Sequence, residues 1–429
     1  LKRRAMSPKC ASEADVLVID SGGGYVRAGW SSGVAPDVIE PNCSASPARG
    51  GEVAVGCEIL DLAAYTLGRP TQRGFVLDLE QERAIWHAVV HRAGLGPKAL
   101  QGRAVFVTEA LRTPSMLRRE IAELLFEEFG VSAVGMLPAP LLAPHSPKLA
   151  HLLHSENPCY TVLDVGYSGC VAIPCFEGCP LPGASRRSAI GGRVLTNLLG
   201  ERLRLHHYDL SENWLLVEDM LSKVCEVSLD FDADLRSRYA SVAPMVYKMP
   251  DYQNTWRGSV ANEAELAQGA TGGSEDRQRV CLHAERVAVP EVLFSPQDQG
   301  LQAAGLAELV TQAILGVGNA ELRPHLGQVV LCGGLARLPR IGERLHAELR
   351  RLLPSAWPLA VLVEPEPELS AWRGAASLLR DSEAFRSAQL RTRKEWLGDG
   401  PRAEAKGAGV ASSPAKTPGR GTGAASSPA

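Results

Sequence analysis

The sequence predicts an α/β protein built as two lobes around a ligand cleft. Its 429 residues exceed what one ordinary hydrophobic core organises. Short apolar runs alternate with longer amphipathic stretches through both halves, which is typical of α/β proteins. One unit, an apolar strand followed by a glycine-rich turn and a second strand, occurs once in each half. This repeated unit predicts that the two halves have similar cores.

Four apolar runs are expected to form central strands, and four amphipathic stretches are expected to form major helices. The expected strands are 16–20, 104–109, 161–166 and 328–334. The expected helices, with apolar residues at three- and four-residue spacing, are 114–129, 194–203, 214–229 and 339–353. The strand-then-helix order therefore continues through the whole chain.

Composition excludes several classes of protein. The formal net charge of -3 and the pI near 6.4 give no overall reason to expect nucleic-acid binding. No apolar run approaches the roughly 18 residues of a membrane span, so we expect an intracellular protein that contacts no membrane. The ten cysteines are scattered through expected strands and helices, which favours reduced thiols over a disulfide framework.

The repeated unit carries the chemistry of a phosphate site. Its first copy is VLVID-SGGG-YVRAGW, with Asp20 ending the strand, and its second is TVLD-VGYSG-CVAIP, with Asp164 in that place. Glycines allow backbone N–H groups to approach phosphate oxygens closely, and a carboxylate at a strand end can hold a hydrated divalent cation. Two such hairpins that face each other would form a phosphate clamp.

Two other features have more than one interpretation. The run VVLCGGLARLPRIGERL places Gly333 and Gly334 between a strand and a helix, where the loop could pass beneath a base or serve only for packing. The following helix is rich in arginine, which favours a solvated polar face over a DNA-facing stripe. These arginines are Arg337, Arg340, Arg344, Arg350 and Arg351.

From about residue 15 to 397 the chain resembles the actin and actin-related proteins, whose ATPase core also occurs in sugar kinases and the large heat-shock chaperones. The resemblance is carried by motifs in the right order, and it implies an actin-like fold with two lobes around a nucleotide cleft. The motifs are LVIDSGGGYVRAGW, RGFVLDLEQERAIW, VTEA, LLFEEFG, VLDVGYSGCVAIPCFEG, GGRVLTNLL, ERVAVPEVLFSP, VVLCGGLARLPRIGERL and the late Trp372.

The resemblance also implies a domain organisation. Residues 15–160 are expected to form the first lobe, with an insertion at 42–72 that is shorter than actin's, and 161–362 the second lobe, with an insertion at about 239–279. Residues 363–398 are expected to return to the first lobe. We expect 1–14 to be a flexible segment and 399–429, rich in Ala, Gly, Ser and Pro, to be a disordered tail.

Carried over residue by residue, the family's cleft implies a set of nucleotide-contacting positions. They are Asp20, Gly22, Gly23, Arg27, Asp164, Gly166, Gly192, Gly333 and Gly334. Arg27 stands where actin has a phosphate-facing lysine, and Asp20 and Asp164 would hold Mg²⁺ only if a nucleotide is bound.

Other positions depart from the actin pattern. Tyr167 replaces actin's second aspartate, and Ala139 aligns with the glutamine that orients the attacking water. Leu221, Ser222 and Glu368 stand at the base- and ribose-contacting positions. We therefore expect ATP or ADP with Mg²⁺ to bind weakly or not at all, and we expect no catalytic residue and no enzyme activity of the chain's own.

Local phrases, including Pro41-Asn42-Cys43 and MVYKMPDY at 245–252, are similar to a nuclear subfamily of actin-related proteins. That likeness implies a scaffold subunit of a SWR/SRCAP-type chromatin remodeller, which exchanges a variant histone into nucleosomes. The implied partners are the remodeller ATPase and a small zinc-binding subunit, with any nucleosome contact made through the complex. The short 42–72 insertion predicts no homo-polymer. The alternatives are a slow ATPase of the actin superfamily and a cytoskeletal filament-forming protein.

Overall fold

The computed structural model describes residues 15–47, 53–59, 65–94, 100–153, 157–252, 254–261 and 278–398. The expected flexible segment 1–14 and the expected tail 399–429 lie outside the described residues, as does the middle of the expected 239–279 insertion.

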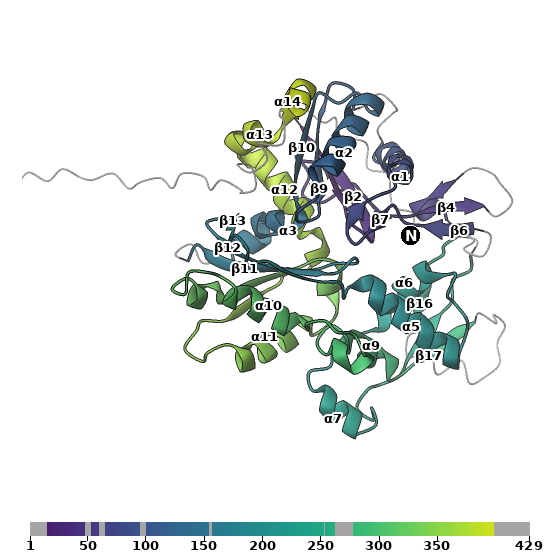
Figure 1. The fold of residues 1–429 in the computed structure, drawn as a ribbon. Helices are drawn as coiled ribbons and strands as arrows, with labels where there is room; N and C mark the ends of the chain where they lie inside the picture. Colours follow the sequence, from purple (N-terminus) through teal and green to yellow (C-terminus); the bar gives the residue numbers. More distant parts are fainter. Residues whose placement is uncertain are drawn as a thin grey trace, which may run out of the picture.

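Two six-stranded sheets of the same plan organise the chain (Figure 1). In each, a central strand pairs antiparallel with the strand that follows it and parallel with a later strand. The first sheet has the order β20-β10-β9-β1-β2-β3, and the second runs β13-β12-β11-β18-β19 with β14 paired to β12. The sequence repeat therefore corresponds to a repeat of topology.

The strands of the two sheets have the following bounds. The first sheet contains β1 (Leu17–Ser21), β2 (Tyr25–Trp30), β3 (Val38–Pro41), β9 (Ala104–Glu109), β10 (Ala133–Pro138) and β20 (Arg391–Thr392). The second contains β11 (Cys159–Val165), β12 (Cys170–Phe176), β13 (Cys179–Pro180), β14 (Arg186–Ser188), β18 (Gln328–Cys332) and β19 (Ala360–Leu362).

Helices lie against both sheets (Figure 1). Those of the first lobe are α1 (Leu79–Arg92), α2 (Ser115–Glu128), α12 (Ser370–Asp381), α13 (Glu383–Gln389) and α14 (Arg393–Gly398). Those of the second lobe are α5 (Gly192–His206), α6 (Trp214–Val224), α7 (Phe231–Arg236), α9 (Glu285–Glu291), α10 (Leu306–Leu315) and α11 (Ile341–Leu352). Of these, α10 and α11 pack on the second sheet, whereas α5 packs with α6 and α9, and α7 packs with α9. Two short helices, α3 (Ala139–Leu142) and α4 (Pro147–Ala150), lie between the lobes in the chain.

Burial on both faces explains why the central strands are almost entirely apolar. Successive side chains of a strand point to opposite faces, so Leu17 and Ile19 pack with α1 and α2, whereas Val16 and Val18 pack with α12. Trp372 of α12 is fully buried in that second cluster, and its indole N–H donates to the Val18 carbonyl at 3.2 Å. The C-terminal helices, yellow in Figure 1, therefore lie on the sheet that the N-terminal strands begin.

Smaller sheets project from the expected insertions. In the 42–72 region, β4 (Ser44–Pro47) pairs with β5 (Ala54–Val55) and β6 (Tyr65–Gly68), and β7 (Thr71–Gln72) pairs with β8 (Phe75–Val76). In the later insertion, β15 (Met245–Lys248) pairs with β16 (Ser259–Val260) and β17 (Arg279–Leu282).

Two expected elements end earlier than the sequence predicts. The helix expected at 214–229 ends at Val224, because the amides of Glu226 and Val227 donate to the carbonyls of Arg286 and Pro339. The strand expected to reach residue 334 ends at Cys332, since Gly333 takes a φ of 96° that a strand does not accept. Both limits are set by neighbouring segments or by the loop that follows.

The arginines of α11 and the loop before it form the expected solvated face only in part, because Arg337, Arg340 and Arg351 are exposed and Arg344 is not. Arg344 is nearly buried, with its side chain 11% exposed, and it pairs with Glu291 at 2.9 Å and Glu348 at 2.6 Å. Arg340 pairs with Glu226 at 2.8 Å. These contacts bind the helix to α9 and to the segment after α6, so the arginines mainly stabilise the second lobe.

Candidate functional site

A cleft of about 1100 Å³ lies between the two repeated hairpins. Its walls include the turn after β1, the turn after β11, the start of α5, one side of α6 and the loop after β18. All nine expected nucleotide-contacting residues line this cleft. The sequence repeat thus places its two carboxylates and its glycines around one space.

The first carboxylate of the cleft is fully engaged by the protein. The β1–β2 register sets Asp20 directly opposite Arg27, and their side chains form an ion pair at 3.0 Å. Thr108, at the end of β9, donates its hydroxyl to the other Asp20 oxygen at 2.6 Å. Arg27, expected to face a phosphate, therefore binds the aspartate expected to hold the cation.

The second carboxylate has a different environment at the equivalent place. Register puts Val171 opposite Asp164 on β12 and Cys332 beside it on β18, so neither neighbour matches Arg27 or Thr108. Burial, together with the Asp20 charge, raises the pKa of Asp164 to about 7. Among the described residues, Asp164 has no hydrogen-bond donor to its carboxylate, and it remains the carboxylate most able to accept a cation.

The glycine turns allow close approach of the chain to a ligand or to itself. Gly22 and Gly166 each donate to the fourth residue of their turn, Tyr25 and Gly169, at 3.0 Å. A Cβ at Gly23 would overlap the Ser168 hydroxyl, and one at Gly192 would lie 3.1 Å from the Tyr167 ring. The two turns therefore touch each other, and side chains larger than glycine would separate them.

Gly333 and Gly334 form the floor of the cleft beside the second hairpin. A Cβ at Gly333 would overlap an Asp164 carboxylate oxygen, which explains the requirement for glycine there. The Gly333 amide donates to the Pro367 carbonyl at 3.1 Å, and Gly334 begins a short 3₁₀ helix. The loop that the sequence left undecided between packing and binding does pack, but it also lines the cleft.

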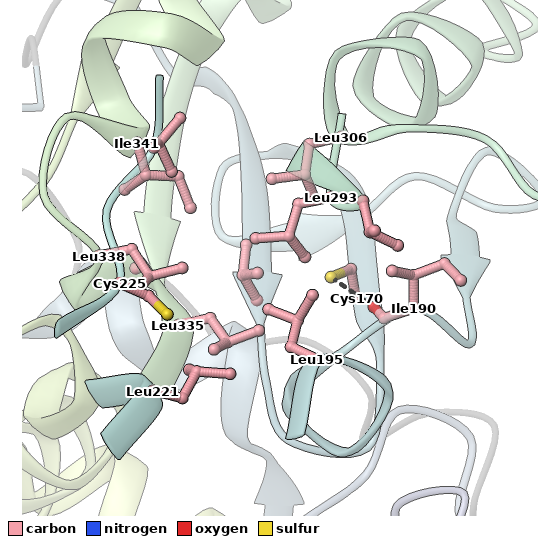
Figure 2. Packing of buried hydrophobic residues seen from close by; sticks show 14 of the residues in the cluster. Cys170, Ile190, Leu195, Leu221, Cys225, Leu293, Leu306, Leu335, Leu338 and Ile341 are labelled. Carbon is pink, nitrogen blue, oxygen red and sulfur yellow. Dashed lines mark hydrogen bonds between the residues drawn. The ribbon is translucent and has the colours of Figure 1, made fainter. Parts of the chain in front are cut away.

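The three positions expected to contact a base or ribose, Leu221, Ser222 and Glu368, all line the cleft. Leu221 is 5% exposed and belongs to the apolar cluster that contains Leu335 and Cys225, as Figure 2 shows. Glu368 pairs with Arg337 at 3.3 Å. Leu221 offers no polar group to a ligand, whereas other polar side chains, Lys223 and Arg257 among them, also line the cleft.

Ala139 occupies the position that the resemblance assigns to a water-orienting side chain. Ala139 lines the cleft at the start of α3 and carries only a methyl group. The described residues contain no cluster of three or more His, Cys, Asp or Glu side chains with metal-binding geometry. The glycine turns could hold an anion, and the methyl group of Ala139 offers no polar contact to a nucleophile.

Sequence reasoning missed an arginine that bonds to several residues lining the cleft. Arg69, in the short connection between β6 and β7, contacts the first glycine turn, α6 and the Tyr167 ring. Its principal partner, Glu218, is 149 residues away in the chain, and no local motif signals the pair. Tyr167 was noted only as the loss of an aspartate, yet its ring lies 4.3 Å from the Arg69 guanidinium.

A buried carboxyl group of α1 also supports the turn after β1. Glu82 of α1 is fully buried and accepts the hydroxyl of Ser21, which directly follows Asp20. Burial raises the pKa of Glu82 to about 7. The first hairpin is therefore supported by a carboxyl group whose burial favours its protonated form.

Comparison with known proteins agrees with this architecture. A model of the actin family, described as "Actin", matches residues 11–406. None of the described helices has the length and apolar character needed to cross a membrane.

Named relatives cover most of the chain. It is 32% identical to "Actin-related protein 6" of Oryza sativa subsp. indica, over 87% of this chain and 94% of the relative. It is 29% identical to the protein of that name in Arabidopsis thaliana over the same shares, and 27% identical to the one in Drosophila melanogaster, over 84% of this chain and 91% of the relative. The family model spans nearly all of the chain, and the fold has two sheets of the same plan with a cleft between the lobes. The chain belongs to the actin family.

Proposed function

We propose that this chain is a nuclear scaffold subunit of a SWR/SRCAP-type chromatin remodeller and has no significant ATPase activity. The observation that carries the proposal is the state of the cleft. It keeps the two lobes and the glycine turns, but Ala139 supplies no polar group and Arg27 occupies the Asp20 carboxylate. An actin-family body with such a cleft is suited to holding partners rather than to turnover. Its likeness to proteins named "Actin-related protein 6" supports the choice of complex.

The proposed partners are the remodeller ATPase and a small zinc-binding subunit, and the proposed contact surface is the insertion at about 239–279. Within it, the Tyr247 hydroxyl donates to Asp219 of α6 at 2.5 Å and Lys223 donates to the Gly258 carbonyl at 2.8 Å. The β15–β17 sheet is therefore held firmly on the second lobe. A rigid base of this kind is suited to a partner contact.

Native purification of the tagged chain from its own cells, followed by mass spectrometry of the co-purifying proteins, tests the proposal. Recovery of a remodeller ATPase and a small zinc-binding protein in fixed ratio is expected. Deleting 262–273 should reduce that recovery, whereas deleting 399–429 serves as a control of similar kind. Full recovery without 262–273 would place the partner surface elsewhere, and absence of both partners from the intact chain would refute the assignment.

A slow ATPase of the actin superfamily is the second candidate. It is favoured by one observation, the Asp164 carboxylate that faces the cleft without a described hydrogen-bond donor. Nucleotide bound through the glycine turns would place Mg²⁺ near this carboxylate. Detection of stoichiometric ADP in the purified chain would favour this candidate over the first.

A further inference from the structure

The Arg69 side chain is bound by the first glycine turn. One guanidinium nitrogen donates to the carbonyls of Gly23 at 3.1 Å, Gly24 at 2.7 Å and Asn42 at 3.0 Å. These carbonyls belong to the turn after β1 and to the residue that follows β3. This terminal nitrogen carries two N–H groups, so the three converging carbonyls share them.

The same side chain crosses the cleft to the second lobe. Its other terminal nitrogen lies 2.8 and 2.7 Å from the two carboxylate oxygens of Glu218 on α6. The guanidinium plane lies between two aromatic rings, 4.3 Å from the Tyr167 centroid and 4.4 Å from the Trp214 centroid. Arg69 thus contacts the second lobe through both the turn after β11 and the start of α6.

The ion pair between Arg69 and Glu218 is nearly buried. The side chains of Arg69 and Glu218 are 8% and 9% exposed, so separation of the lobes would exchange a buried ion pair for two hydrated charges, and the pair alone gives little net stabilisation. The aromatic rings add attraction to a cation from which water is excluded, and this attraction is lost when the lobes separate. The rings and the carbonyl contacts of Arg69 therefore favour the closed arrangement of the lobes, and the ion pair fixes its geometry.

The lobes are fixed separately where the chain passes between them. There Arg373 of α12 pairs with buried Glu364 at 3.1 Å, and the Ser146 hydroxyl donates to the same carboxylate at 3.2 Å. A Cβ at Gly374 would overlap the Leu142 carbonyl, so α12 packs directly on the connecting segment. Arg69 contributes a tie that shares no residue with this hinge.

We propose that Arg69, Glu218, Tyr167 and Trp214 form an interlobe latch that keeps the cleft closed without a bound ligand. A ligand held by both glycine turns would link the lobes only while it is bound, whereas Arg69 links the first turn to the second lobe in the ligand-free chain as well. The latch makes the relative position of the lobes a property of the chain itself. This inference concerns the isolated chain and does not depend on the proposed complex.

Hydrogen–deuterium exchange of the purified full chain, without nucleotide, tests the latch. Arg69→Ala is expected to speed exchange of the amides at 22–24 and at 214–218 by about tenfold or more, because local opening becomes easier. Arg69→Lys should do nearly the same, since an ammonium lacks the planar fork and stacks less well between two rings.

Arg92→Ala is the matched control. Arg92 also pairs with two glutamates, Glu40 at 3.2 Å and Glu58 at 2.8 Å, but all of these residues lie in the first lobe. Its loss should leave exchange at 214–218 unchanged. If Arg69→Ala fails to fold, Glu218→Gln, which keeps the side-chain shape, carries the test. The latch would be overturned if the amides at 22–24 and 214–218 exchanged no faster in an Arg69 or Glu218 variant than in Arg92→Ala.

Discussion

Replacing each repeated aspartate by asparagine should have opposite effects on stability. Asp20→Asn retains an acceptor for Thr108 but removes the charge that balances Arg27, whose side chain is only 10% exposed. Breaking one side of a buried ion pair costs about 3–5 kcal/mol. With an unfolding entropy of about 2.1 cal/mol/K per residue, the melting temperature of a chain of this size should fall by about 3–5 °C.

Asp164→Asn should be neutral or stabilising above pH 7. The folded pKa of Asp164, about 7, lies above the ordinary value of 3.8, so folding favours the protonated form. Its contribution to stability is present at low pH and is lost as the pH rises from about 4 to 7. The asparagine variant does not lose stability in this way. Its stability should therefore equal that of the unsubstituted protein near pH 4 and exceed it at pH 8.

Calorimetric melts of both variants at pH 4.5 and pH 8 check this pair of predictions. The Asp20 variant should melt lower than the unsubstituted protein at both values, and the Asp164 variant should not melt lower at either. If Asp164→Asn loses as much stability as Asp20→Asn at pH 8, the asymmetry derived from the strand register is wrong.

Four further outcomes are expected. In a single-turnover assay with labelled ATP, hydrolysis should fall short of an actin-like rate by about 10²- to 10⁴-fold, because Ala139 positions no water; an actin-like rate that vanishes in Asp164→Ala would contradict this. Sedimentation in Mg²⁺ and salt should leave the chain in the supernatant, and a pellet that forms above a critical concentration would restore the filament alternative. Glu82→Gln should gain stability relative to the unsubstituted protein as the pH rises from about 4.5 to 7 and hold that gain above it, since the folded pKa is raised to about 7; parallel pH profiles of the two proteins would refute this. Gly333→Ala should destabilise the fold, because its Cβ would overlap the Asp164 carboxylate at a positive φ, whereas Gly318→Ala, with open space around it, should have little effect in the same thermal melts.

The sequence was informative where the signal is local. The two hairpins were found because an apolar strand, an aspartate and a glycine-rich turn follow one another within a few residues, and the strand register then brings Asp20 and Asp164 to one cleft. The same locality made the core strands predictable from apolar runs. Fold and phosphate turns could therefore be predicted from short patterns.

Contacts between distant segments were not predictable in this way. Arg69 has no motif of its own, and its partner Glu218 became visible only when the lobes were placed together. Arg344 lies on the polar side of an amphipathic helix, which suggested solvent, yet Glu291 of another helix meets it in a nearly buried pair. The helix α6 ends at Val224 because the amides of Glu226 and Val227 donate to carbonyls of other segments. No pattern in residues 225–229 predicts these contacts.

The pairing of the arginines in α11 and in the loop before it has a consequence for how ionic strength would affect any binding of this surface to a nucleic acid. Each phosphate that a protein neutralises contributes a slope of about -0.9 to log K against log salt concentration, through the release of condensed counterions. Arg337, Arg340 and Arg344 are neutralised by glutamates, and Arg350 donates to the carbonyls of the loop after the helix. Among the five arginines, Arg351 alone is exposed with no described ion pair. This helix can therefore add little counterion release, and a steep salt dependence of an assembly that contains the chain would have to come from its other subunits or from other surfaces.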